Sequence, residues 1–219
     1  AMLRSARWWL PIHLGFLPLA IAAHGAGIHP GWYLAGFIGL VLASWFSARK
    51  YRISFLHLCD GLALVSPIGL FFGRLANFIN GELWGRATNA PWAVVFPQEA
   101  GLTHGDPLYM ENAIDLLHQG ALVPRHPSQL YQAALEGVLL FTVMVLARKT
   151  AWGRANGRLG GLYLCVYAVV RFIAEFFREP EIVHFGWLTQ GQLLSMVLLF
   201  PVGLVVMARA RPSGSAKPA

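Results

Sequence analysis

The chain has 219 residues, of which 56% are apolar and only 12% are charged, whereas an ordinary soluble domain carries about 25% charged residues. A soluble protein this apolar could not cover its own surface with polar groups, and a disordered chain needs the opposite balance. Its two cysteines are too few for a disulfide scaffold. The composition therefore predicts an integral membrane protein.

Six apolar stretches are long enough, or nearly so, for membrane-spanning helices, which need about 20 residues. They are 7–24, 31–47, 55–80, 130–147, 159–177 and 187–208. We predict an all-α integral membrane protein with about six transmembrane helices and a small outward-facing cap between the third and fourth. The predicted parts are helices in 1–80, a periplasmic cap segment in 81–129, helices in 130–208 and a cytoplasmic tail in 209–219. Residues 2–25 also fit a cleavable signal peptide, but we interpret them as a retained helix.

The positions of the cations predict the orientation of the chain. Most of them fall in alternate loops, on one side of the membrane: Arg4, Arg7, Arg49, Lys50, Arg52, Arg148, Lys149, Arg154, Arg158, Arg209, Arg211 and Lys217. Positively charged loops stay in the cytoplasm, so both termini are expected there, and 81–129 and 178–186 are expected outside. A nucleic-acid site would instead gather its cations on one folded surface, so we expect no nucleic-acid partner.

The first candidate site is the sequence GRLANFINGELWGR, Gly73 to Arg86, at the end of the third apolar stretch. Arg74 and Asn77 are three residues apart and share a helix face, where a guanidinium and an amide offer donors to a phosphate. The polar and glycine residues that follow would let the backbone turn and approach a ligand: Asn80, Gly81, Glu82 and Gly85. The alternative is a capped helix whose Arg74 pairs with a carboxylate.

The second candidate site is RHPSQLY, which leads into the fourth stretch. His126 could act there as an acid, a base or a donor to phosphate. The alternative is a helix start that carries an interfacial Tyr131.

The third candidate site is YAVVRFIAEFFREP in the fifth stretch. Spacings of four, four and three predict one stripe on a helix, formed by Tyr167, Arg171, Glu175 and Arg178. Two arginines against one glutamate leave an excess positive charge for a lipid headgroup, with Glu175 orienting an arginine. The alternative is a self-neutralised ladder, for which the sequence offers two further carboxylates, Asp60 and Glu136.

Other residues carry no recognisable metal or nucleophile motif. The sequence holds no HExxH, no CxxC and no carboxylate cluster suited to a hard cation. We therefore expect no metal and no cofactor. Cys59 and Cys165 lie in apolar runs and are expected to fill space.

At these motifs the sequence resembles bacterial prolipoprotein diacylglyceryl transferases. The resemblance covers about residues 31 to 208 and is strongest in GRLANFINGELWGR. It continues through PWAVVFP, VPRHPSQLY, YAVVRFIAEFFREP and GQLLSM. It implies a multi-pass enzyme of the bacterial inner membrane that moves the diacylglyceryl group of phosphatidylglycerol onto the lipobox cysteine of a prolipoprotein, releasing glycerol phosphate. The implied partners are phosphatidylglycerol, the prolipoprotein signal peptide with its lipobox cysteine, and membrane lipids.

The resemblance also implies roles for individual residues. The catalytic residues expected are Arg74, Asn77, His126, Tyr167 and Arg171. The substrate-binding residues expected are Asn80, Glu82, Gly85, Glu175 and Arg178. In this hypothesis the two catalytic arginines hold the phosphate, Asn77 donates to it or to the glycerol, and His126 or Tyr167 assists the proton transfer. Residues 86–125 would cover the mouth of the site.

Two features depart from the family pattern. The family usually carries HGGLIG or a tyrosine version of it, whereas this chain reads LAGFIG, with Leu34 at the histidine position. The chain also begins about one transmembrane helix later than the family. An alternative function is therefore a catalytically inactive paralogue that binds anionic phospholipid or a lipoprotein precursor. A transporter or channel is a further alternative, but the two halves of the sequence show no corresponding broken helices.

Overall fold

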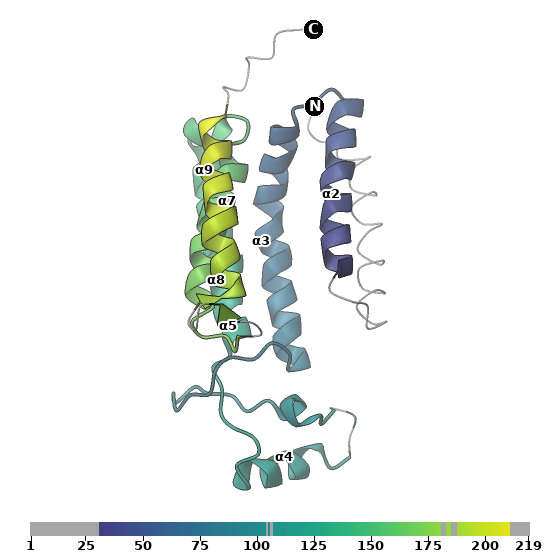
Figure 1. The fold of residues 1–219 in the computed structure, drawn as a ribbon, viewed down its shortest axis with the longest axis vertical. Helices are drawn as coiled ribbons and strands as arrows, with labels where there is room; N and C mark the ends of the chain where they lie inside the picture. Colours follow the sequence, from purple (N-terminus) through teal and green to yellow (C-terminus); the bar gives the residue numbers. More distant parts are fainter. Residues whose placement is uncertain (1–30, 104, 106, 181–182, 185–187, 211–219) are drawn as a thin grey trace. The chain divides into compact units, whose positions relative to one another are not determined.

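The computed structural model of the chain describes residues 31–103, 105, 107–180, 183–184 and 188–210, and these are mostly helical (Figure 1). Two compact units divide at residues 58 and 59, and each is described by itself. The predicted first apolar stretch, 7–24, lies outside the described residues, as does the tail from residue 211 onward.

The described part of the first unit is mainly helix α2, Gly31–Lys50. Its last turn carries Arg49 and Lys50, where positive charge is favourable because the helix dipole is negative there. The guanidinium of Arg49 lies 4.8 Å from the ring centroid of Trp45. Leu34, the residue that departs from the family pattern, lies in α2.

Within the described residues, three helices are long and apolar enough to cross a membrane. The first is α3, Phe55–Asn80, which contains Pro67. The second, Ser128–Lys149, is a continuous run of α5 (Ser128–Gln132), the π-helical η2 (Ala133–Leu139) and α6 (Leu140–Lys149). The third, Gln190–Ala208, is a continuous run of α8 (Gln190–Leu194), the π-helical η4 (Ser195–Leu199) and α9 (Phe200–Ala208).

Helix α7, Arg158–Ala174, is joined to α6 through the short 3₁₀ helix η3, Trp152–Arg154. Asp60 of α3 fixes the start of α7. The Asp60 carboxylate accepts hydrogen bonds from the backbone N–H groups of Gly157 at 2.7 Å and Gly160 at 2.8 Å. A carboxylate at a helix N-terminus satisfies unpaired N–H donors and complements the helix dipole. Asp60 therefore pins α3 to α7.

Helices α7 and α9 pack at very short range. A Cβ on Gly161 would lie 2.7 Å from the carbonyl oxygen of Gly203, and a Cβ on Gly203 would lie 2.6 Å from Sγ of Cys165. Small residues allow such close backbone contact, which is how helices associate in membranes. Cys165 thus fills space in the helix contact, as the sequence predicted.

A buried hydrophobic cluster joins α3, α6 and α7. It is formed by Ala63, Leu140, Met144 and Leu159.

The segment between α3 and α5 contains the 3₁₀ helix η1, Pro97–Ala100, and helix α4, Tyr109–His118. Arg125 ties the segment together, forming isolated antiparallel bridges with Ala87 and Val94. A short hairpin of β1 (Val183–His184) and β2 (Leu188–Thr189) precedes α8.

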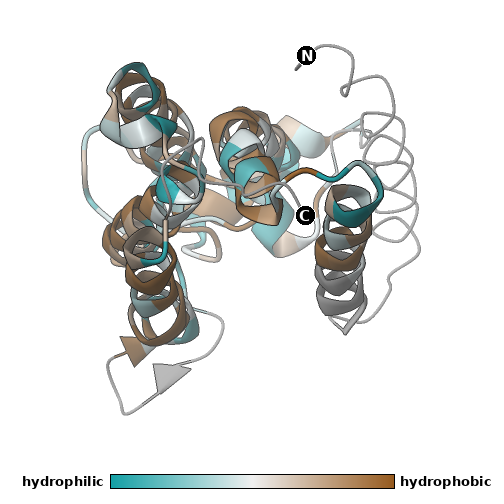
Figure 2. Cartoon of the chain, turned by 90° about the horizontal axis from the view of Figure 1, so that it is seen from above, coloured by the Kyte–Doolittle hydropathy of each residue, from teal (hydrophilic) through white to brown (hydrophobic). Residues whose placement is uncertain are grey.

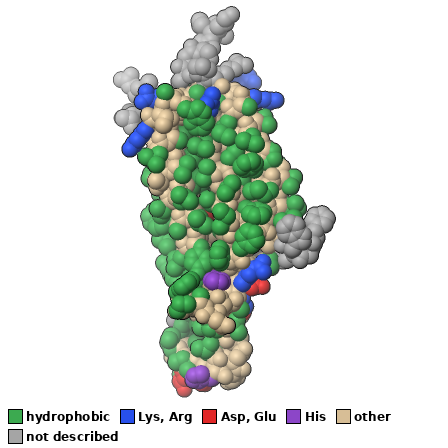
Figure 3. Space-filling model, turned by 90° about the vertical axis from the view of Figure 1, so that its left-hand side faces the viewer, with side chains coloured by type: hydrophobic (Ala, Val, Ile, Leu, Met, Phe, Trp, Pro, Cys, Tyr) green, Lys and Arg blue, Asp and Glu red, His purple; other side chains and the backbone are tan. Residues whose placement is uncertain are grey.

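The surface of the second unit has the character expected for contact with lipid. Apolar residues occupy much of its helices in the end-on view (Figure 2), and apolar side chains cover the face shown in Figure 3. Arg148, Lys149, Arg154 and Arg158 lie where α6 turns into α7. The described residues thus form a helical membrane protein. The six-span count, its orientation and the cap remain predictions.

Candidate functional site

The centre of the site is Glu136, whose carboxylate joins arginines from two other helices. Arg74 of α3 donates from Nε and Nη2 to Oε2 of Glu136 at 3.3 and 3.1 Å. Arg171 of α7 donates from Nη1 to Oε1 at 3.2 Å. The Glu136 side chain is 0% exposed, and the arginines are 15% and 12% exposed. Because a buried charge without a partner is strongly destabilising, the ion pairs with Glu136 help to hold both arginines in place.

Glu175 extends this cluster on the other side of Arg171. Its Oε2 lies 3.1 Å from Nη2 of Arg171, an ion pair without hydrogen-bond geometry. A Cβ on Gly191 would lie 2.9 Å from the Glu175 carboxylate, so the glycine at the start of α8 leaves room for it. The predicted i, i+4 contact between Arg171 and Glu175 is therefore present.

The four charges sum to zero, which differs from the excess positive charge expected from the sequence. Glu136 supplies the missing negative charge, and it is one of the two carboxylates that the sequence offered. An incoming phosphate must therefore bind donors that the glutamates do not use. Among the described residues, Nη1 of Arg74 has no acceptor and supplies such donors. The charged residues form what we call the ion-pair cluster: Arg74, Glu136, Arg171 and Glu175.

Tyr167 lies one helical turn before Arg171 in α7. Its hydroxyl interacts electrostatically with Glu136, Arg171 and Arg74, and its ring stacks on Tyr163 with centroids 5.9 Å apart. The structure therefore brings together three of the predicted catalytic residues, namely Arg74, Tyr167 and Arg171.

The residues that follow α3, 81–86, form a tight loop held against the start of α5, which we call the signature loop. Gly81 has φ +66°, a left-handed conformation that ends the helix at little cost for glycine. The amide of Gln129 donates to the carbonyl of Glu82 at 2.6 Å, and the hydroxyl of Ser128 donates to the carbonyl of Leu83 at 3.1 Å. The loop is thus positioned by buried polar groups on α5.

Asn77, in the last turn of α3, contacts this loop, since its Nδ2 donates to Oε2 of Glu82 at 3.4 Å. Asn80 is the last residue of α3 and is exposed. Asn77 lies three residues from Arg74 on α3, and Asn80 and Glu82 lie farther toward the 81–129 segment.

Gly85 is enclosed by backbone from two other segments. A Cβ there would lie 2.3 Å from the carbonyl oxygen of His126 and 2.6 Å from that of Phe177. Its N–H donates to the His126 carbonyl at 3.0 Å. The prediction gave Gly85 a place beside a ligand, whereas in this structure its missing side chain makes room for protein backbone.

Arg178 does not lie on the predicted helical stripe. Helix α7 ends at Ala174, and the chain then turns. Arg178 forms an isolated antiparallel bridge with Gly85, and its carbonyl accepts a hydrogen bond from Nε of Arg86 at 3.1 Å. The sequence predicted a helix as far as Arg178 because Phe176 and Phe177 are apolar and continue the apolar stretch beyond the end of α7.

The ring of His126 is positioned by hydrogen-bonded aromatic side chains. Its Nδ1 lies 3.2 Å from the hydroxyl of Tyr131, and that hydroxyl accepts a hydrogen bond from Nε1 of Trp92 at 2.6 Å. If Nδ1–H donates to Tyr131, Nε2 is left with a lone pair and can accept a proton. If Tyr131 donates instead, Nε2 carries the hydrogen. The first tautomer is therefore the one a general base requires.

Arg125 is a structural cation for which the sequence predicted no role. Its Nε donates to Oε2 of Glu99 at 2.7 Å, and its Nη1 donates to the Gly85 carbonyl and to Oε2 of Glu179, both at 3.1 Å. The hydrogen bond to Glu99 is the main cause that raises the pKa of Arg125 above its ordinary value. Arg125 thereby ties η1 and the end of the α7 turn to the signature loop.

Two glutamines continue the Glu136 face of the same helix. Gln129 and Gln132 are fully buried, and neither amide atom of Gln132 has a hydrogen-bond partner among the described residues. A spacing of three and four residues places them in line with Glu136. This periodicity was visible in the sequence, but the apolar neighbours gave no reason to treat the stripe as a site. Among the described residues, no three His, Cys, Asp or Glu side chains lie close enough to hold a metal ion.

A helical membrane protein with a cluster of charged side chains among its helices is the class that this fold and site define. The family model for prolipoprotein diacylglyceryl transferase matches residues 19–209 of the chain, and the chain therefore belongs to this family.

Individual relatives share the same name. The phosphatidylglycerol–prolipoprotein diacylglyceryl transferase of Idiomarina loihiensis is 43% identical over 189 residues, which cover 84% of this chain and 62% of the relative. The protein of the same name from Xanthomonas euvesicatoria is 44% identical over 183 residues, covering 80% of this chain and 60% of the relative. That of Neisseria meningitidis is 45% identical over 200 residues, covering 84% and 68%. The matches thus span 60 to 68% of the length of these relatives.

Proposed function

We propose that this chain transfers the diacylglyceryl group of phosphatidylglycerol to the lipobox cysteine thiol of prolipoproteins, the first step of bacterial lipoprotein maturation. The observation that carries the proposal is the ion-pair cluster, in which Glu136 holds Arg74 and Arg171 together. In the reaction a bond forms between the thiol sulfur and a glycerol carbon, and the bond from that carbon to the phosphate oxygen breaks. Glycerol phosphate leaves, and the thiol proton passes to a base.

The arginines can stabilise the negative charge that develops in this reaction. Negative charge grows on the phosphate as it leaves, and preorganised donors in a water-poor site stabilise such charge strongly. A guanidinium can grip a phosphate with two parallel N–H groups. In the proposal Arg74 offers its unused Nη1 to the phosphate, while Glu136 and Glu175 fix the plane of Arg171. Asn77 donates to the phosphate or to the glycerol.

The thiol must lose its proton because the thiolate is the nucleophile. The proposal assigns this step to His126, acting through Nε2 while Nδ1–H donates to Tyr131, or to Tyr167 beside the arginines. Polar residues at the end of α3 and just after α3 and α7 would contact the lipid headgroup or the peptide. This assignment takes in Asn80, Glu82 and Arg178, with Gly85 shaping the loop.

The proposed setting is the bacterial inner membrane. Helices in 1–80 and 130–208 would cross it, 81–129 would form the periplasmic cap, and 209–219 would be a cytoplasmic tail, as would the N-terminus. The cationic turn between α6 and α7 supports this orientation. The prolipoprotein signal peptide would approach from the side of the cap.

The test is transfer from phosphatidylglycerol to a synthetic lipobox peptide by the purified chain, followed by mass spectrometry of the peptide. Transfer to cysteine, and none to a serine version of the peptide, is the expected result. Absence of transfer by a folded chain that binds the lipid would identify an inactive relative and overturn the proposal. Restored transfer in Leu34→His would then attribute the loss to the missing family histidine.

Two variants test the roles of the residues. Arg171→Lys should lower kcat/KM by roughly 10²–10³-fold, the usual effect of losing a donor to developing charge, whereas Arg154→Lys on the exposed turn should be neutral. His126→Ala should lower kcat by about 10²–10⁴-fold and leave lipid binding intact, as expected for a general base. Normal turnover in either site variant would remove that residue from the mechanism.

A further inference from the structure

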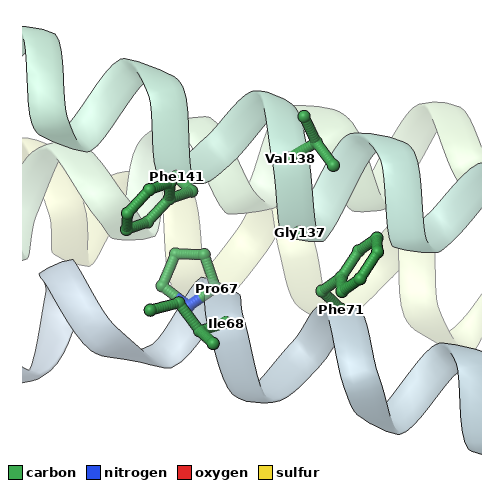
Figure 4. A pocket seen from close by; sticks show the side chains of 6 residues that line it. All are labelled: Pro67, Ile68, Phe71, Gly137, Val138 and Phe141. Carbon is green, nitrogen blue, oxygen red and sulfur yellow. The ribbon is translucent and has the colours of Figure 1, made fainter.

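An apolar pocket of about 180 Å³ opens between α3 and the continuous helix formed by η2 and α6 (Figure 4). Its lining is entirely apolar: Pro67, Ile68, Phe71, Gly137, Val138 and Phe141. Ile68 is 44% exposed and Val138 is 54% exposed. The pocket therefore opens at the surface of the second unit, where lipid would be its neighbour.

The pocket lies where the backbone of both helices departs from regular α-helix. On α3, Pro67 removes a backbone N–H from the helix ladder. On the opposite wall, Gly137 and Val138 belong to the π-helical η2, a type of irregularity that recurs at functional sites. A Cβ on Gly137 would lie 2.7 Å from Cβ of Phe71, so the helices touch at this point. The pocket is thus bounded on one side by a close helix contact.

The pocket lies next to the ion-pair cluster along both helices. Phe71 precedes Arg74 by three residues, which is a rise of about 4.5 Å along a helix, and Gly137 directly follows Glu136. Arg74 and Glu136 are themselves hydrogen-bonded. The same two helices therefore carry charged donors at Arg74 and an apolar pocket about one turn away, on the side toward the N-terminus of α3.

This succession of charge and hydrocarbon matches one kind of ligand, a phospholipid whose phosphate lies at Arg74. We propose that the pocket receives an acyl chain of the donor phospholipid, in an inference that rests on the function proposed above. A single hydrocarbon chain fits a pocket of this size, whereas a helical peptide with its side chains is about 10–12 Å across. A chain already dissolved in the bilayer gains little from apolar surroundings, so the pocket sets the position of the lipid more than its affinity.

Positioning matters because the reacting glycerol carbon lies between the phosphate and the acyl esters. An arginine grip on the phosphate leaves the lipid free to swing about that point. A second contact on an acyl chain fixes the direction in which the glycerol carbon faces the thiol. Fixing reactants in this way is a major source of rate enhancement.

The experiment uses a phosphatidylglycerol that carries a photoreactive diazirine midway along one acyl chain. The purified chain is irradiated with this lipid in mixed micelles, and the adducts are mapped by mass spectrometry. We expect adducts on the lining residues of α3 and η2, and competition by unlabelled phosphatidylglycerol but not by phosphatidylcholine. Equal competition by phosphatidylcholine, or adducts spread evenly over the helices, would overturn the proposal.

A matched pair of variants tests the pocket itself. Val138→Trp fills it from an exposed wall and should reduce the adducts about tenfold, because overfilling a packed site disfavours its occupant. Val197→Trp is the control, since Val197 is also an exposed valine in a π-helical segment but does not line the pocket. Ile68→Trp fills the pocket from α3 and guards against misfolding of the first variant. Undiminished adducts in both filled variants would refute the inference.

Transfer assays separate this inference from the proposed function. With dioleoyl phosphatidylglycerol the filled variants should lose transfer, whereas with the dihexanoyl lipid, whose chains barely enter the pocket, they should match the wild type. Specific adducts in a wild-type chain without transfer would overturn the proposed function and retain the pocket. Transfer without adducts at the pocket would do the reverse.

Discussion

Replacing Glu136 by glutamine tests whether one buried carboxylate organises the site. Glu136 is 0% exposed and accepts three hydrogen bonds from two arginines. Glutamine keeps the shape and one acceptor but removes the charge, which leaves Arg74 without a carboxylate partner. Removing one partner of a buried ion pair costs about 3–5 kcal/mol. At roughly 2–4 °C per kcal/mol for a chain of this length, the melting temperature of Glu136→Gln should fall by about 10 °C.

The assay is thermal unfolding in detergent, followed with a dye that fluoresces on reaction with thiols. Cys165 is buried and Cys59 is partly buried, so both react mainly after unfolding. Glu82→Gln is the matched control, because Glu82 is only partly buried and its side-chain hydrogen bond with the Asn77 amide, at 3.4 Å, survives the change. Its melting temperature should stay close to that of the wild type. If Glu136→Gln melts no lower than Glu82→Gln, the arginines do not depend on Glu136 as argued.

Two further predictions concern the signature loop and the orientation. Gly85→Ala should abolish folding of the loop and with it all transfer, because the added methyl would lie 2.3 Å from a backbone oxygen. Gly73→Ala, on open helix surface, should be tolerated. Equal activity of the two variants would contradict the close approach of backbone to Gly85. In a background whose natural cysteines are replaced by alanine, a cysteine at position 111 should react with a membrane-impermeant thiol reagent added outside intact cells, and one at position 154 should react only after lysis. Both residues are exposed in the structure, so labelling of both from the same side would refute the predicted topology.

The helices could be predicted from the sequence because their signal is local. Apolar runs of adequate length marked five described helices, and the structure moves their boundaries by only a few residues at most ends. The contact of Arg171 with Glu175 was predictable for the same reason, since it joins residues four apart on one helix.

The centre of the site could not be predicted in the same way. Glu136 is 62 residues from Arg74 and 35 from Arg171, and no periodicity connects residues on three different helices. The sequence offered Asp60 as an equal candidate, and only the folded chain shows that backbone N–H groups occupy it. Arg178 was misplaced because hydrophobicity does not mark where a helix ends when apolar residues continue beyond it.

The π-helical η2 has a consequence for how this chain can change by insertion and deletion. An α-helix turns about 100° per residue, so losing one residue from a regular helix reorients everything beyond it. A π-turn instead absorbs one additional residue, and η2 does so between the start of α5 and the core residues of α6. Deleting one residue within η2 would restore an ordinary helix of nearly the same length. The flanking α-helical segments would stay in phase, and only residues inside η2, Glu136 among them, would shift around the helix axis relative to Leu140 and Met144. One residue therefore sets the angular offset between the charged centre and the packing that supports it.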